Sequence, residues 1–158
     1  MKKYFIISAL FILSFLYSAN PKDIVGYWLT QNGKSIILIT REKDTFSGKI
    51  VWLKEPRYPK GDKNEGKEKM DLNNPDIKKR TDKLIGLKLL WDFKFKKDKW
   101  VGGKIYDPEN GKTYFCKIKM NKKGNLIIKG SIDKWGIVGR STVWKKVNNP
   151  ENDKSDSR

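Results

Sequence analysis

The residue types that most enzymatic chemistry requires are scarce in this sequence. It has no histidine and a single cysteine, Cys116, which argues against histidine-dependent triads, histidine metal sites and thiolate zinc sites. A single cysteine also excludes an intramolecular disulfide. Cys116 alternates with apolar residues between Tyr114 and Met120, so we expect it to be a small buried side chain. We predict no catalytic residue, no metal site and no cofactor.

One segment does gather polar side chains, namely Asp71, Asn74, Asp76 and Arg80. Their oxygen atoms could bind a hard cation, or the group could form a polar clamp. The alternative is helix capping, in which Asn74 is the N-cap, Pro75 takes the first helical position and Asp76 favours the helix dipole. We favour capping.

A second polar run, Asp107–Gly111, reads Asp-Pro-Glu-Asn-Gly. The carboxylates of Asp107 and Glu109 could act as a general acid and a general base. The same composition is typical of a tight turn, and we favour that interpretation.

Aromatic side chains are a third candidate for chemistry. Six tryptophans and two tyrosines could line a ligand cavity or pack the core: Trp28, Trp52, Trp91, Trp100, Trp135, Trp144, Tyr106 and Tyr114. We expect core packing for most of them. Trp52, Trp100 and Tyr114 are the candidates for the cavity.

These residues belong to a chain with a dense β pattern. Eight short segments are rich in β-branched and aromatic residues: Ile24–Thr30, Lys34–Thr40, Thr45–Leu53, Leu84–Phe95, Trp100–Tyr106, Lys112–Met120, Asn125–Ile132 and Gly139–Lys146. Asn32-Gly33 predicts a hairpin turn, and Gly102-Gly103 predicts a bend or bulge. Leu84–Phe95 could instead be a helix. The spacing predicts an all-β fold, an antiparallel up-and-down β-barrel of about eight strands.

The two ends of the sequence differ from this pattern. Residues 1–19 combine Lys2 and Lys3 with an apolar run, which is typical of a cleaved signal peptide; an uncleaved anchor is the alternative. We therefore expect a periplasmic or extracellular protein that does not span a membrane after cleavage. Residues 20–147 would form the barrel, and residues 148–158 a polar disordered tail.

The chain is strongly basic, with a formal net charge of +17 and 30 lysines against 5 arginines. The lysines are scattered and arginine is rare, so we expect no nucleic-acid partner. Residues 54–83 form a long proline-containing loop, in which a short helix could begin near Asn74-Pro75. This basic loop could contact an anionic polymer, a lipid headgroup or a partner protein.

Two features resemble the calycin superfamily of lipocalins and fatty-acid-binding proteins. Gly26-Tyr27-Trp28 on the first strand resembles the Gly-x-Trp of these barrels, and Arg140 on the last strand resembles the arginine that covers this tryptophan. The resemblance implies that Gly26, Trp28 and Arg140 close one end of the barrel through a cation–π contact.

Further motifs resemble a family of exported bacterial proteins known as domain of unknown function 2147. They are Gly26–Trp28, Gly48–Leu53, Asp71 with Asn74–Asp76 and Arg80, Gly86-Leu87, Gly102–Pro108, Gly111–Tyr114, and Gly139-Arg140 with Trp144. The resemblance covers nearly the whole chain after the predicted signal peptide and implies a lipocalin-like barrel without naming a substrate. We therefore predict a non-enzymatic barrel that binds a small hydrophobic or amphipathic ligand. The alternative is a surface-acting module that uses the basic loop.

Overall fold

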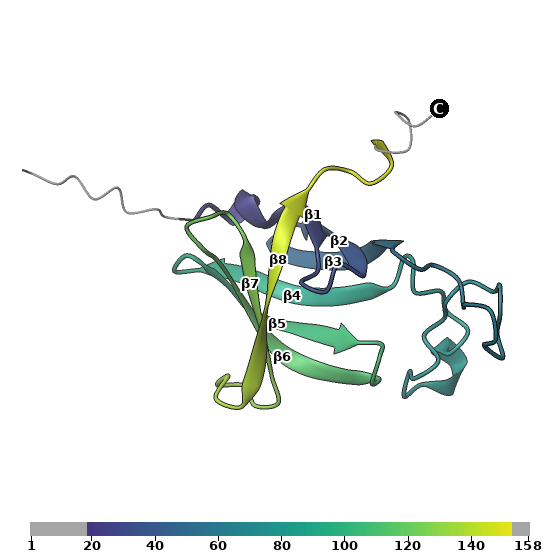
Figure 1. Ribbon diagram of the computed structural model, residues 1–158. Coiled ribbons are helices and arrows are strands. Elements are labelled where there is room, and N and C mark those ends of the chain that lie inside the picture. The colour runs from purple at the N-terminus through teal and green to yellow at the C-terminus, as the bar shows by residue number, and fades with distance from the viewer. Residues whose placement is uncertain (1–18, 153–158) are drawn as a thin grey trace, which may run out of the picture.

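The computed structural model describes residues 19–152, so residues 1–18 of the predicted signal peptide and residues 153–158 of the predicted tail lie outside it. Eight strands form a closed antiparallel barrel in chain order, as predicted (Figure 1). They are β1 (Gly26–Leu29), β2 (Ser35–Glu42), β3 (Thr45–Leu53), β4 (Lys88–Lys96), β5 (Lys99–Asp107), β6 (Lys112–Met120), β7 (Leu126–Ser131) and β8 (Gly139–Val147). The helical alternative for Leu84–Phe95 is wrong, since β4 occupies most of that segment.

Local turn chemistry explains several of the strand connections. In the β1–β2 turn only Gly33 has a positive φ, of 67°, so Asn32-Gly33 does not form the two-residue hairpin turn that its sequence favours. Lys97 and Asp98 between β4 and β5 do form one, because both have positive φ and Lys96 pairs with Lys99.

The predicted bulge at Gly102-Gly103 is present, since the β5–β6 register shifts between Trp100 and Gly103. Packing in the core also requires glycine at position 103. A Cβ atom there would lie 2.4 Å from the Phe93 ring, so only glycine lets this ring fill the core.

The N-terminal 3-10 helix η1 (Pro21–Ile24) plugs one end of the barrel. Its Ile24 is buried, and the indole Nε1 of Trp28 donates a hydrogen bond of 2.7 Å to the Ile24 carbonyl. Asn20 caps η1 through a capping box with Asp23. The plug therefore closes the end of the barrel at which β1 begins.

Residues 54–87 connect β3 to β4 and project beyond the barrel (Figure 1). The loop contains the short 3-10 helix η2 (Ile77–Lys79) and two isolated β-bridges, Arg57 to Glu68 and Met70 to Lys83. The N-cap of η2 is Asp76, not Asn74 as predicted, because the Asp76 carboxylate accepts the Lys78 amide. Among residues 19–152, no helix is both long and apolar enough to span a bilayer.

Candidate functional site

A cavity of about 1230 Å³ opens at the end of the barrel opposite η1. In an up-and-down barrel the β1–β2, β3–β4, β5–β6 and β7–β8 connections all lie at the same end, and all four contribute to its lining. Small-molecule sites commonly measure about 300–1,000 Å³. The cavity is therefore large enough for a small organic ligand.

The floor of this cavity is apolar. It consists of side chains from five strands, namely Ile50, Leu89, Ile105, Ile128 and Trp144. Alternation along β3, β5, β7 and β8 directs four of them inward, whereas Leu89 lies where the β3–β4 register shifts. Trp144 is only 3% exposed. An apolar group in the cavity would thus contact aliphatic side chains and one indole.

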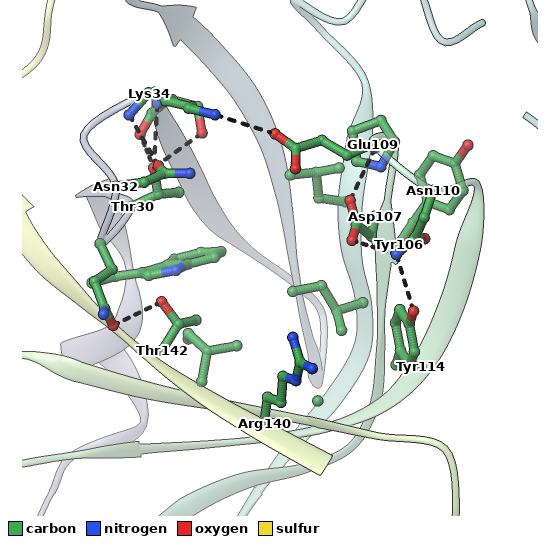
Figure 2. A pocket seen from close by; sticks show the side chains of 18 of the residues that line it. Thr30, Asn32, Lys34, Tyr106, Asp107, Glu109, Asn110, Tyr114, Arg140 and Thr142 are labelled. Atoms are coloured by element: carbon green, nitrogen blue, oxygen red, sulfur yellow. Dashed lines mark hydrogen bonds and ion pairs between the residues drawn. The ribbon is translucent and has the colours of Figure 1, made fainter. Parts of the chain in front are cut away.

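Arg140 projects into the mouth of the cavity from β8 (Figure 2). Register explains its direction, because Leu126 pairs with Trp144 and Gly130 pairs with Arg140, and residues separated by an even number share a face. Gly130 has no side chain, so no side chain of β7 stands beside Arg140 at this position. Within residues 19–152, no hydrogen bond or ion pair engages the Arg140 side chain.

Several other polar groups of the rim are engaged with one another. Lys34 Nζ lies 3.7 Å from Glu109 Oε1, which links the β1–β2 and β5–β6 turns across the mouth (Figure 2). Gln31 Oε1 accepts the Val143 amide at 2.8 Å, and Asn110 Nδ2 donates to the Tyr114 hydroxyl at 3.1 Å. Among the lining cations of residues 19–152, Arg140 and Lys54 have no such partner, whereas Lys34 and Lys69 are paired with carboxylates.

The run Asp107–Gly111 forms a turn. The Asp107 carboxylate accepts hydrogen bonds from the Glu109 amide and the Asn110 side chain, and the Gly111 amide donates to the Asp107 carbonyl. Asn73 of the long loop donates to the carbonyls of Pro108 and Glu109. The Asp107 carboxylate thus stabilises the turn, and the Glu109 carboxylate forms the ion pair with Lys34 at the rim.

The polar cluster of the long loop, Asp71 with Asn74, Asp76 and Arg80, forms a clamp on β5. Asp71 is fully buried, and its two carboxylate oxygens accept the Tyr106 hydroxyl at 2.7 Å and Asn74 Nδ2 at 2.6 Å. Asn74 accepts the Asp76 amide on its side chain and Arg80 Nε on its carbonyl. Burial and the Asp71 hydrogen bond raise the pKa of the Tyr106 hydroxyl well above its usual range.

All four residues of the predicted motif take part in this clamp. Within residues 19–152, no group of three or more acidic or cysteine side chains is arranged to hold a metal ion. Asp71 and Tyr106 are 35 residues apart in the chain, so the hydrogen bond between them ties the loop to the barrel wall beside the cavity.

Comparison with known proteins identifies the family of this chain. The profile of DUF2147, described as "Uncharacterized protein conserved in bacteria", matches residues 26–146. The chain belongs to the DUF2147 family. It is also similar to a solved structure, protein HP1028 from the human pathogen Helicobacter pylori, which is described as belonging to the lipocalin family. The two are 29% identical with a TM-score of 0.66 over 83% of this chain and 86% of that one. The search of curated proteins found no significant match.

In this DUF2147 barrel, the three predicted cavity residues have different positions. Tyr114 lines the cavity. Trp100 is fully buried and donates a hydrogen bond to the Pro21 carbonyl in the plug, while half-buried Trp52 is not among the lining residues. The prediction from sequence missed Trp144. Its alternation with Thr142 and Arg140 on the last strand was the signal that could have identified this inward face.

The structure also corrects the predicted closure contact. Trp28 is fully buried, but the cation over its ring is Lys146, whose Nζ lies 5.4 Å from the centroid. The reason is register, because Lys146 pairs directly with Trp28 whereas Arg140 lies six residues away towards the cavity mouth. Gly26 has a φ of 130°, which favours glycine, and lies against the Lys146 side chain.

Proposed function

We propose that this DUF2147-family protein is a binding protein that holds a small amphipathic molecule in its open cavity. The observation that supports this most is an apolar floor beneath a rim with one unpaired guanidinium, that of Arg140. The similarity to a lipocalin-family structure supports it further, since such barrels have room for one small ligand.

The geometry favours one orientation of the ligand. Its apolar part would lie against Leu89, Ile128 and Trp144, where burial of apolar surface provides the affinity. Its polar end would face Arg140. A carboxylate or phosphate group suits this position best, because the planar guanidinium binds such groups with two parallel hydrogen bonds.

Binding is better supported than catalysis. The sequence has no histidine, and the carboxylates nearest the cavity are engaged in the Asp107 turn and the Lys34–Glu109 ion pair. The basic loop is a weaker candidate for an anionic partner. Residues 54–83 contain ten cationic and seven acidic side chains, and Lys69 and Lys83 already pair with Glu55 and Glu68.

We propose that the protein acts in the periplasm or outside the cell, because residues 1–19 have the composition of a signal peptide. The N-terminal sequence of the protein recovered from separated cell fractions and medium tests this. A mature chain that begins near Asn20 outside the cytoplasm is the expected result. An intact Met1 in the cytoplasm would contradict it.

The test of binding is direct. Native mass spectrometry of protein purified from its host should show a bound small molecule, and dodecanoate should displace anilinonaphthalene sulfonate from the cavity more effectively than dodecanol does. Displacement by neither compound, together with a mass that shows nothing bound, would contradict the proposal. Equal displacement by both compounds would support a binding cavity but would contradict a role for Arg140 in recognising the charged end of the ligand.

A further inference from the structure

The β7–β8 connection exposes an unusual concentration of apolar side chains. Within residues 19–152, five of the eight large hydrophobic residues that are exposed lie in or beside this connection: Phe115, Ile132, Trp135, Ile137 and Val138. Trp135 is 68% exposed and Ile137 is 78% exposed. Clustered exposure of this kind marks an interaction surface more often than scattered apolar residues do. We refer to residues 132–138 as the β7–β8 tip.

The tip has a fixed backbone that holds these side chains outward. The Asp133 carboxylate accepts the amides of Ile137 at 3.0 Å and Val138 at 2.7 Å, and the Ile132 amide donates to the Val138 carbonyl. Lys117 Nζ, from the neighbouring strand β6, donates to the Trp135 carbonyl at 2.9 Å. The outward side chains are therefore a property of an ordered turn.

Positive charge surrounds the tip. Lys134 Nζ lies 4.9 Å from the centroid of the Trp135 ring, and Lys117 pairs directly with Lys129 across strands β6 and β7. Like charges in such a pair are unfavourable, so a nearby anionic surface would stabilise them. Asp133 contributes one negative charge to this surface against the three positive charges of Lys117, Lys129 and Lys134, so its net charge is positive.

We propose that the β7–β8 tip docks on the surface of a lipid bilayer that contains anionic lipids. Tryptophan and aliphatic side chains favour the boundary between headgroups and acyl chains, and lysines beside them attract anionic headgroups. A second copy of this chain is a poorer occupant, because a symmetric contact would bring Lys117, Lys129 and Lys134 against their own counterparts. Ile132 and Val138 also line the cavity, so docking would place the cavity mouth at the bilayer.

Vesicle binding tests this without any cavity ligand, so its outcome is separate from that of the proposed function. The predicted mature chain, from Asn20 onward, is used, because it contains all eight strands and the apolar segment before it could itself bind lipid. Co-sedimentation is measured with vesicles of phosphatidylcholine alone and with about one-third phosphatidylglycerol. The variants are Trp135→Ser, Ile137→Ser and Lys134→Glu, with Ile77→Ser as a control that removes an equally exposed isoleucine from η2.

Binding to the anionic vesicles is the expected result, and high salt should weaken it. Trp135→Ser and Ile137→Ser should each reduce the affinity about ten-fold or more, while Ile77→Ser should leave it unchanged. Lys134→Glu should weaken binding to anionic vesicles only. Absence of vesicle binding, or equal losses in Ile137→Ser and Ile77→Ser, would overturn the proposal. Binding of the tip to an acidic protein but to no vesicle would overturn it as well.

Discussion

The indole Nε1 of Trp100 donates a hydrogen bond to the carbonyl oxygen of Pro21, 3.2 Å away, across 79 residues of chain. This contact and that of Trp28 with Ile24 hold η1 in the closed end. Trp100→Phe should lower the free energy of unfolding by about 2 kcal/mol, because it removes the hydrogen bond and leaves a cavity. Chemical denaturation measures this. Trp135→Phe, at an exposed tryptophan, should change stability by less than about 0.5 kcal/mol, and equal losses in the two variants would contradict the argument.

Strands β1 and β8 show which parts of the fold could be predicted from the sequence. Alternation and turn residues are local signals, so eight strands and a closed barrel followed from the sequence. The register between β1 and β8 is set by non-local pairing. Six residues of strand span about 20 Å, so the choice between Arg140 and Lys146 over Trp28 moves a cation from one end of the barrel to the other.

The candidate site shows the same division. Capping in the long loop was predictable from Asn74, Pro75 and Asp76, although the cap moved by two residues. The hydrogen-bond partner of Asp71 could not be predicted from the sequence, because Tyr106 lies on β5, 35 residues away. The cavity floor follows from alternation only after the register of β7 with β8 places Gly130 opposite Arg140.

Lys146 and Arg140 should therefore have separate effects. Lys146→Ala removes the cation over Trp28 and should lower stability by about 0.5–1 kcal/mol, with ligand affinity unchanged. Arg140→Gln should leave stability nearly unchanged but weaken dodecanoate binding about ten-fold, because hydrogen bonds to charged groups contribute about 1.5–3 kcal/mol. Thermal unfolding and fluorescence displacement measure the two effects. A stability loss in Arg140→Gln without a loss of affinity would reverse the assignment.

Gly130 offers a way to fill the cavity without disturbing the barrel. A Cβ atom there would lie 3.6 Å from Ile105 and 3.8 Å from Tyr114, which are ordinary contact distances. Gly130→Leu should fold, and its side chain should occupy the mouth and abolish binding of anilinonaphthalene sulfonate. Gly130→Ala is the matched control and should retain it. Full binding by a folded Gly130→Leu protein would show that the probe binds elsewhere.

The Asp71–Tyr106 contact should govern the order of the long loop. Tyr106→Phe leaves one buried oxygen of Asp71 without its donor, which should cost about 1–3 kcal/mol. Limited proteolysis should then cut within residues 54–83 faster than in the unaltered protein, because the loop loses its anchor on β5. Tyr114→Phe removes a hydroxyl that, within residues 19–152, bonds only Asn110 at an exposed site, and it should leave the cleavage rate unchanged.

Alkaline pH should destabilise the barrel partly through Cys116. Burial raises the pKa of its thiol from 9.0 to about 12, so between these values the unfolded chain releases this proton and the folded chain retains it. The contribution to stability is complete below pH 9 and is lost as the pH rises towards 12, with a slope of about 1.4 kcal/mol per pH unit.

Denaturant titrations at a series of alkaline pH values should show a shallower decline in the free energy of unfolding for Cys116→Ala. Tyr106, whose pKa is also raised, contributes to both proteins, so the difference between the two slopes reports the thiol alone. Identical slopes would mean that the thiol ionises equally well in the folded barrel.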